Sequence, residues 1–243
     1  MPVTNAQSGT RVDEIADGIY RISTPVPPNP ALPTGFTFNQ FLVVDEKPVL
    51  FHMGMRKVFP LVRDAVASVM PVERLRWLSF SHWEPDESGS IEEWLAVAPN
   101  ATPLVGRIGS LVTASDASRD PRMLADGETI AIGKKRVRWI DTPHLPHGWD
   151  AGYLFETTTR TLFCGDVFTQ PGAAHDPVTG GDILGPSEAM RAAMDYYANP
   201  RGAAALLEKL AATEAQLLAC MHGASYRGDA PAALRALAKE LGK

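Results

Sequence analysis

The order of apolar and polar residues divides the chain into segments of two kinds, some patterned like strands and others like helices. The strand patterns cover residues 18–23, 40–45, 48–52, 74–80, 102–105, 128–132, 136–140, 152–157, 160–164 and 216–220. The helical patterns cover residues 57–70, 90–98, a stretch from about 108, 187–198, 202–213 and 231–241. Ser90 followed by Glu93 predicts a capping box at the start of the second helix. The stretch 168–186 is rich in Gly, Pro and Asp, which predicts a long loop.

Two pairs of strand segments are separated by only a few turn residues and therefore predict β-hairpins. One pair turns at Gly133-Lys134-Lys135 and the other at Thr158-Thr159. Strands come first with helices between them, and this order occurs twice along the chain. The pattern favours two stacked sheets with helices outside, although other α/β architectures share the same periodicity. No linker is long enough to divide the chain, so we expect a single domain over residues 1–243.

Composition and charge narrow the class of protein. The chain has 243 residues, a net charge of −5 and a pI near 5.7, which argues against a nucleic-acid or membrane-surface partner. No apolar run approaches the roughly 20 residues of a membrane span, and the amino terminus has no signal-peptide pattern. We therefore expect a cytoplasmic protein. The two cysteines, Cys164 and Cys220, show no disulfide spacing and are interpreted as small buried core residues.

The most informative segment is Ser81-His82-Trp83-Glu84-Pro85-Asp86, which follows an apolar strand. His82, Glu84 and Asp86 are two residues apart, so in an extended chain their side chains point to the same side. An imidazole and two carboxylates held together repel or desolvate one another unless a cation joins them. A metal site is the simplest explanation, and the alternative is a solvated polar loop.

Three further residues follow predicted strands and support the metal site. His147 follows the strand at 136–140, Asp166 follows the strand that ends at Cys164, and His222 follows the strand that ends at Cys220. Sheets of α/β proteins place their sites at the carboxyl ends of strands. We therefore expect these side chains to meet the first three at one edge of the sheets.

These residues together resemble the metallo-β-lactamase superfamily in its di-iron branch. HWEPDESGS is similar to the flavodiiron segment His-x-Glu-x-Asp-His-Ser-Gly-Ser, and the resemblance extends through FCGDVF, DYYANP and HGASYRG over about residues 15–230. It implies a metallo-β-lactamase-type αββα sandwich. It also implies two non-haem irons, the first held by His82, Glu84 and His147 and the second by Asp86 and His222, with Asp166 between them. Imidazole and carboxylate ligands without thiolate suit iron or manganese, with zinc as a further alternative.

The sequence departs from the flavodiiron pattern at several places. Glu87 stands where the family has a His, and it either is a seventh ligand or points away and leaves a coordination position open for a diatomic. His144 is the alternative to His147. His52 and Asp150 are expected to support the ligands from behind. No C-terminal flavodoxin domain and no phosphate-cradling glycine loop is present in the 243 residues, so no FMN is expected.

The resemblance implies a protein that binds O2, and three functions are compatible with it. The protein either reduces O2 or NO with an external electron donor, or senses oxygen for a signalling partner, or binds O2 without turnover. The sequence does not decide whether it is an enzyme. The alternative from a different class is a zinc hydrolase that cleaves an ester, thioester or lactam. Glu84 argues against it, because zinc members of this fold commonly carry His there.

Overall fold

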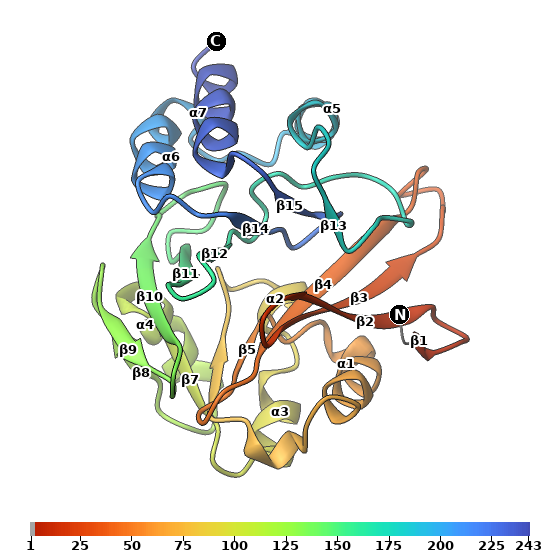
Figure 1. The fold of residues 1–243 in the computed structure, drawn as a ribbon, viewed down its shortest axis with the longest axis vertical. Coiled ribbons are helices and arrows are strands. Elements are labelled where there is room, and N and C mark those ends of the chain that lie inside the picture. Colours follow the sequence, from red (N-terminus) through yellow and green to blue (C-terminus); the bar gives the residue numbers. More distant parts are fainter. Residues whose placement is uncertain (1–2) are drawn as a thin grey trace.

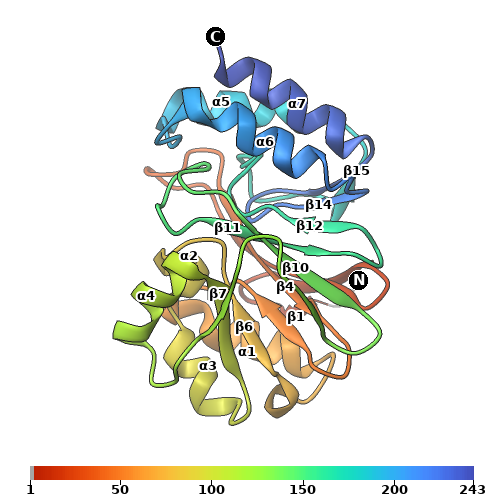
Figure 2. The same cartoon turned by 90° about the vertical axis from the view of Figure 1, so that its left-hand side faces the viewer.

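Two sheets are stacked face to face, and helices cover their outer faces, as Figure 2 shows most clearly. The computed structural model describes residues 3–243. The first sheet has the order β1 (Val3–Asn5), β2 (Thr10–Ala16), β3 (Ile19–Val26), β4 (Phe36–Val43), β5 (Val49–Phe51), β6 (Trp77–Ser79), β7 (Thr102–Gly106) and β8 (Arg122–Leu124). The second has the order β13 (Val178–Thr179), β15 (Ser225–Arg227), β14 (Leu217–Ala219), β12 (Thr161–Phe163), β11 (Gly152–Glu156), β10 (Arg136–Asp141) and β9 (Thr129–Ala131). The predicted αββα sandwich is confirmed.

The helices form the two outer layers. They are α1 (Phe59–Ala67), α2 (Pro85–Ser88), α3 (Ile91–Val97), α4 (Arg107–Asp116), α5 (Leu184–Met194), α6 (Ala203–Ala211) and α7 (Ala230–Leu241), with short 3-10 turns at Arg56–Val58, Val72–Arg74 and Pro200–Gly202. Figures 1 and 2 show α5, α6 and α7 beside the second sheet and α1 and α3 beside the first. Among residues 3–243, no helix combines the length and the apolar character that a bilayer crossing requires.

Three clusters of buried side chains hold the layers together. One lies under the C-terminal helices and includes Leu207 and Leu234, and another lies under α1 and α3 and includes Trp94. The third fills the space between the sheets, where Phe41 and Phe163 approach with ring centroids 5.6 Å apart. Each fully buried side chain of this size contributes about 1.5–3 kcal/mol relative to exposure. The apolar patterns of the sequence are therefore the inner faces of these layers.

Several predicted elements are confirmed with small changes in their bounds. Both predicted hairpins form, as β9–β10 with Ala131 opposite Arg136 and as β11–β12 with Glu156 opposite Thr161. The expected loop 168–186 instead contains the short strand β13 and the start of α5 at Leu184. Strands β1, β2, β8 and β15 were missed by the sequence patterns. Three of these, β1, β8 and β15, span only three residues, which is too short for alternation to be recognised.

Two local predictions are wrong. The capping box does not form, because the Ser90 hydroxyl donates to the Met53 carbonyl at 2.9 Å and Glu93 instead pairs with Arg56 at 2.5 Å. The segment from His82 to Asp86 is also not extended throughout, because Pro85 begins the one-turn helix α2. Glu84 is still extended at φ −135° and ψ 157°. The convergence of the ligands therefore comes from a bend and a helical turn rather than from strand alternation.

Candidate metal centre

Three imidazoles converge at one edge of the sandwich, each just beyond the end of a strand. They are His82 after β6, His147 after β10 and His222 after β14. In each, Nδ1 faces an oxygen acceptor and Nε2 points into the site. The acceptors are the Tyr196 carbonyl at 2.8 Å for His147 and the Thr37 carbonyl at 2.8 Å for His222. Nδ1 of His82 lies 3.1 Å from the Ser81 hydroxyl and 3.1 Å from the Glu87 carboxylate. A proton held on Nδ1 leaves the Nε2 lone pair free for a metal ion.

Carboxylates face these Nε2 atoms. Glu84 lies 3.1 Å from Nε2 of His147 through Oε1 and 3.5 Å from Nε2 of His82 through Oε2. Asp86 lies 3.6 Å from Nε2 of His222. The two imidazole–carboxylate groups therefore occupy opposite sides of the site.

Asp166 lies between the two groups, and its two oxygens face different ways. Oδ2 is 3.4 Å from Nε2 of His147 and 3.8 Å from Nε2 of His82, whereas Oδ1 is 3.1 Å from Nε2 of His222. One oxygen thus serves each side. This is the geometry that a carboxylate shared by two cations requires.

The donor set fits metal ions. One ligand atom from each of four residues lies within 4.8 Å of the others, in His82, Glu84, His147 and Asp166. Among the described residues, Nε2 of His82, Nε2 of His147 and Oδ1 of Asp166 are buried without a hydrogen-bond partner. Buried polar atoms without partners are rare and call for an explanation such as an ion. The structure therefore supports a metal centre made of His and Asp/Glu side chains.

The charged side chains of the site compensate one another. Burial alone would lower the pKa of His82, but the charge of Glu87 and the nearby carboxylate of Glu84 outweigh it and raise that pKa well above its ordinary value. The imidazoles of His147 and His82, whose Nε2 atoms face its carboxylate, lower the pKa of Glu84 to about 2. Burial raises the pKa of Asp86 to about 6. The carboxylates thus favour the charged form of the imidazoles, so a metal cation would displace protons from them.

A cavity of about 170 Å³ opens directly onto this site. Its walls consist of Phe36, Glu84, Asp86, His147, Asp166, Thr169, Met194, Tyr196 and His222. Phe36 stacks on His222 with ring centroids 4.2 Å apart, and the Glu84 side chain is 43% exposed. The cavity is large enough for a small molecule of a few atoms and is reached from solvent.

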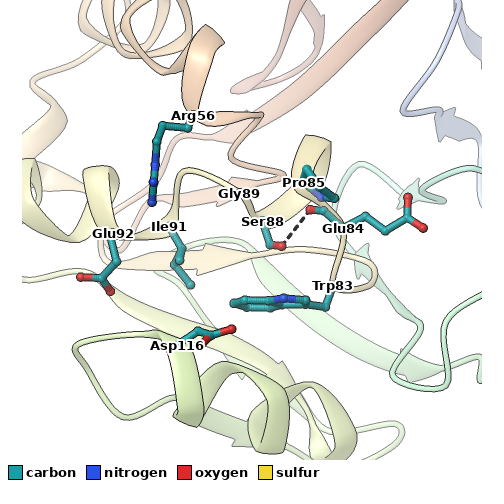
Figure 3. A pocket seen from close by; sticks show the side chains of 9 residues that line it. All are labelled: Arg56, Trp83, Glu84, Pro85, Ser88, Gly89, Ile91, Glu92 and Asp116. Carbon is teal, nitrogen blue, oxygen red and sulfur yellow. Dashed lines mark hydrogen bonds between the residues drawn. The ribbon is translucent and has the colours of Figure 1, made fainter.

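A larger cavity of about 500 Å³ lies on the other side of Glu84, between α2, α3 and α4, and is shown in Figure 3. The ring of Trp83 lies across it, whereas the carboxylate of Glu84 points away. Arg56, Glu92 and Asp116 line it together with apolar groups. None of the three imidazoles lines this cavity, so the smaller one is the candidate for chemistry.

The remaining residues named from the sequence are placed as follows. His144 is exposed, with its backbone N–H donating to the Gly148 carbonyl at 2.7 Å, and it lies outside the cluster of ligand atoms. Asp150 accepts the Trp83 backbone N–H at 2.8 Å and so holds the chain beside His82. Glu87 does not line the cavity but contacts His82 from behind.

His52 lies deeper, and sequence reasoning missed its neighbour Ser81. His52 is fully buried, with Nε2 3.3 Å from the Ser81 hydroxyl and 3.5 Å from Oε1 of Glu87. Burial lowers the pKa of His52, although the charge of Glu87 opposes this effect. Thr37 and Tyr196 were also missed as supports, and because they act through backbone carbonyls, their residue types carry no signal.

The sequence profile of one family, described as ODP family beta lactamase, matches residues 36–223. Among curated proteins, a rubredoxin-oxygen oxidoreductase of Megalodesulfovibrio gigas is 26% identical over 206 residues, covering 81% of this chain and 50% of that protein. A putative diflavin flavoprotein A 2 of Nostoc sp. is 29% identical over 141 residues, covering 56% of this chain and 24% of that protein. The chain thus spans between a quarter and a half of the length of these relatives.

Solved structures agree with the fold. The rubredoxin oxygen:oxidoreductase from Desulfovibrio gigas superposes with a TM-score of 0.84 at 21% identity, covering 95% of this chain and 61% of that one. A fragment of putative diflavin flavoprotein A 5 from Nostoc sp. gives 0.83 at 17% identity, covering 96% of this chain and 95% of that one. At these identities the likeness establishes the two-sheet fold.

Proposed function

The chain belongs to the family described as ODP family beta lactamase, and we propose that it is a di-iron protein that binds O2. The observation that carries the proposal is the common arrangement of the three imidazoles, with Nδ1 anchored and Nε2 directed at carboxylates. The relatives named for oxygen reduction and diflavin chemistry support a redox role over hydrolysis.

The first iron would be held by His82, Glu84 and His147, and the second by Asp86 and His222, with Asp166 shared. The position of the two Asp166 oxygens supports this division. Imidazole and carboxylate ligands without thiolate suit iron, and manganese and zinc are the alternatives. A pair of irons at this place would supply electrons to a bound diatomic molecule.

The protein's own residues have three tasks in this proposal. Thr37 and Tyr196 fix the tautomers of two imidazoles through their carbonyls, so that no reorientation is needed when metal binds. The three carboxylates offset most of the charge of two divalent ions. Phe36 and Met194 give the cavity beside the ligands an apolar wall.

O2 binding is common to the three roles compatible with the sequence. In the first, an external electron donor supports reduction of O2 or NO. In the second, the site with bound O2 signals to a partner protein, and in the third O2 is bound without turnover. The test is elemental analysis of protein purified anaerobically, with an optical spectrum before and after exposure to air. We expect about two irons per chain and a spectral change on oxygenation. Stoichiometric zinc with strong esterase or lactamase turnover would instead favour the hydrolase.

A further inference from the structure

Glu87 is a buried carboxylate whose contacts all lie behind the metal site. Its side chain is 1% exposed. The Ser81 hydroxyl lies 2.7 Å from Oε1 and 2.6 Å from Oε2, and the His82 backbone N–H donates to Oε2 at 2.9 Å. Nδ1 of His82 is 3.1 Å from Oε2. A charged group buried this deeply is tolerated only with such partners.

The one-turn helix α2 explains why Glu87 and its neighbour Asp86 face different surroundings. Consecutive residues of an α-helix point about 100° apart around its axis. Asp86 therefore lines the cavity opposite His222, whereas Glu87 points into the sandwich.

We propose that Glu87 is a positioning residue for His82, and that it acts on the first metal position rather than serving as a ligand of the second. The inference rests on the proposed metal centre. Among the three anchored imidazoles only His82 has a carboxylate beside its Nδ1, with the Ser81 hydroxyl at the same distance of 3.1 Å, whereas the other two have backbone carbonyls. A carboxylate behind a ligating imidazole fixes the ring and makes its other nitrogen a stronger donor.

Ser81 and His52 complete the arrangement. Nε2 of His52 lies 3.3 Å from the Ser81 hydroxyl, which in turn reaches Glu87. Both residues are buried, and the Ser81 hydroxyl also lies 3.1 Å from Nδ1 of His82, so Ser81 contacts the carboxylate and the imidazole together. Glu87 is thereby held behind His82, and the second metal position keeps only Asp86, His222 and the shared Asp166 as protein ligands.

The test compares Zn²⁺ affinity, measured by chelator competition, in the wild type, Glu87→Gln, His82→Ala and the double variant. Glutamine keeps the shape of the side chain but removes its charge. We expect Glu87→Gln to weaken Zn²⁺ binding about 10–100-fold, as is usual for an outer partner of a ligating imidazole. In the His82→Ala background the same change should have little further effect. A full, additive loss in that background would overturn the proposal, because Glu87 would then act without His82.

The control is Glu156→Gln, which removes another fully buried carboxylate at the far end of β11, where Thr158 and Thr159 are its partners. It should leave Zn²⁺ affinity unchanged, and an equal loss there would reveal a general effect of destabilisation.

NMR of the zinc-loaded protein gives a second readout, in which a low-field Nδ1 proton of His82 should be present in the wild type and shifted in Glu87→Gln. Its absence in the wild type would overturn the contact. The test uses Zn²⁺ and so does not depend on which metal the protein holds natively. A native metal other than iron would contradict the proposed function, but the test of Glu87 would remain valid.

Discussion

Replacing Asp166 by alanine removes the only side chain of the site that approaches all three imidazoles, at 3.1 to 3.8 Å from their Nε2 atoms. If Asp166 is shared by two ions, Asp166→Ala should lose both ions, whereas His147→Ala should mainly weaken the binding of the first ion. At a free metal concentration 100 times Kd, binding stabilises the folded state by about 2.7 kcal/mol. For a chain of this size each kcal/mol shifts Tm by roughly 2–4 °C, which gives a metal-induced shift of roughly 5–11 °C.

The assay is thermal unfolding with and without added metal, together with elemental analysis. The metal-induced shift is compared rather than Tm itself, because losing Asp166 also changes the charge balance of the metal-free site. We expect no shift in Asp166→Ala and a reduced shift in His147→Ala. His144→Ala is the matched control and should keep the full shift, since His144 is exposed and outside the cluster. Full metal occupancy in Asp166→Ala would refute the shared-ligand assignment, and a larger loss in His144→Ala than in His147→Ala would reverse the choice between them.

Metal affinity should rise with pH, because carboxylate neighbours outweigh burial and raise the pKa of His82, His147 and His222, so protons must leave before metal binds. Calorimetry in buffers of different ionisation enthalpy should show proton release on binding, and proton uptake would contradict this. Glu87→Gln should raise the midpoint potential of the iron pair in a redox titration, since it removes a negative charge that favours the ferric state; an unchanged potential would argue against an electrostatic role. The purified chain should show no flavin absorption bands, and stoichiometric FMN would contradict that expectation. Gly165→Ala should lower the free energy of unfolding by about 1–3 kcal/mol, because Gly165 has φ +48° and a Cβ would lie 2.6 Å from the Ser81 hydroxyl. Chemical denaturation measures this change, and an unshifted midpoint would count against it.

The ends of strands were the most predictable feature of this site. The sequence patterns end the relevant strands at residues 80, 140, 164 and 220, and the structure ends them within one residue of these positions. Apolar periodicity reports burial directly, so a polar residue after a buried run marks where the chain leaves the sheet. The sheet topology then brings the ends of β6, β10, β12 and β14 to one edge of the sandwich.

The orientation of Glu87 was not predictable from the pattern. Helix α2 is a single turn of four residues, too short for any periodicity, and only Pro85 at its start signals it. The Nδ1 acceptors supplied by Thr37 and Tyr196 are backbone carbonyls, which every residue type provides. Pairings of this kind depend on tertiary structure and leave no mark on composition or spacing.

Left-handed backbone gathers where the strands turn into the site. Gly165 after β12 and Gly223 beside His222 adopt positive φ without a steric penalty. His52 after β5 adopts φ 64°, which for a residue with a Cβ costs of the order of 1–3 kcal/mol. Its N–H donates to the Ser79 carbonyl at 2.8 Å, and its ring lies 4.4 Å from that of Phe51, so these contacts offset the strain. This conformation directs the imidazole towards Ser81 and Glu87, where an extended residue would continue along the strand. The strained residue thus lies behind the metal ligands, in the position that the proposed role of Glu87 requires.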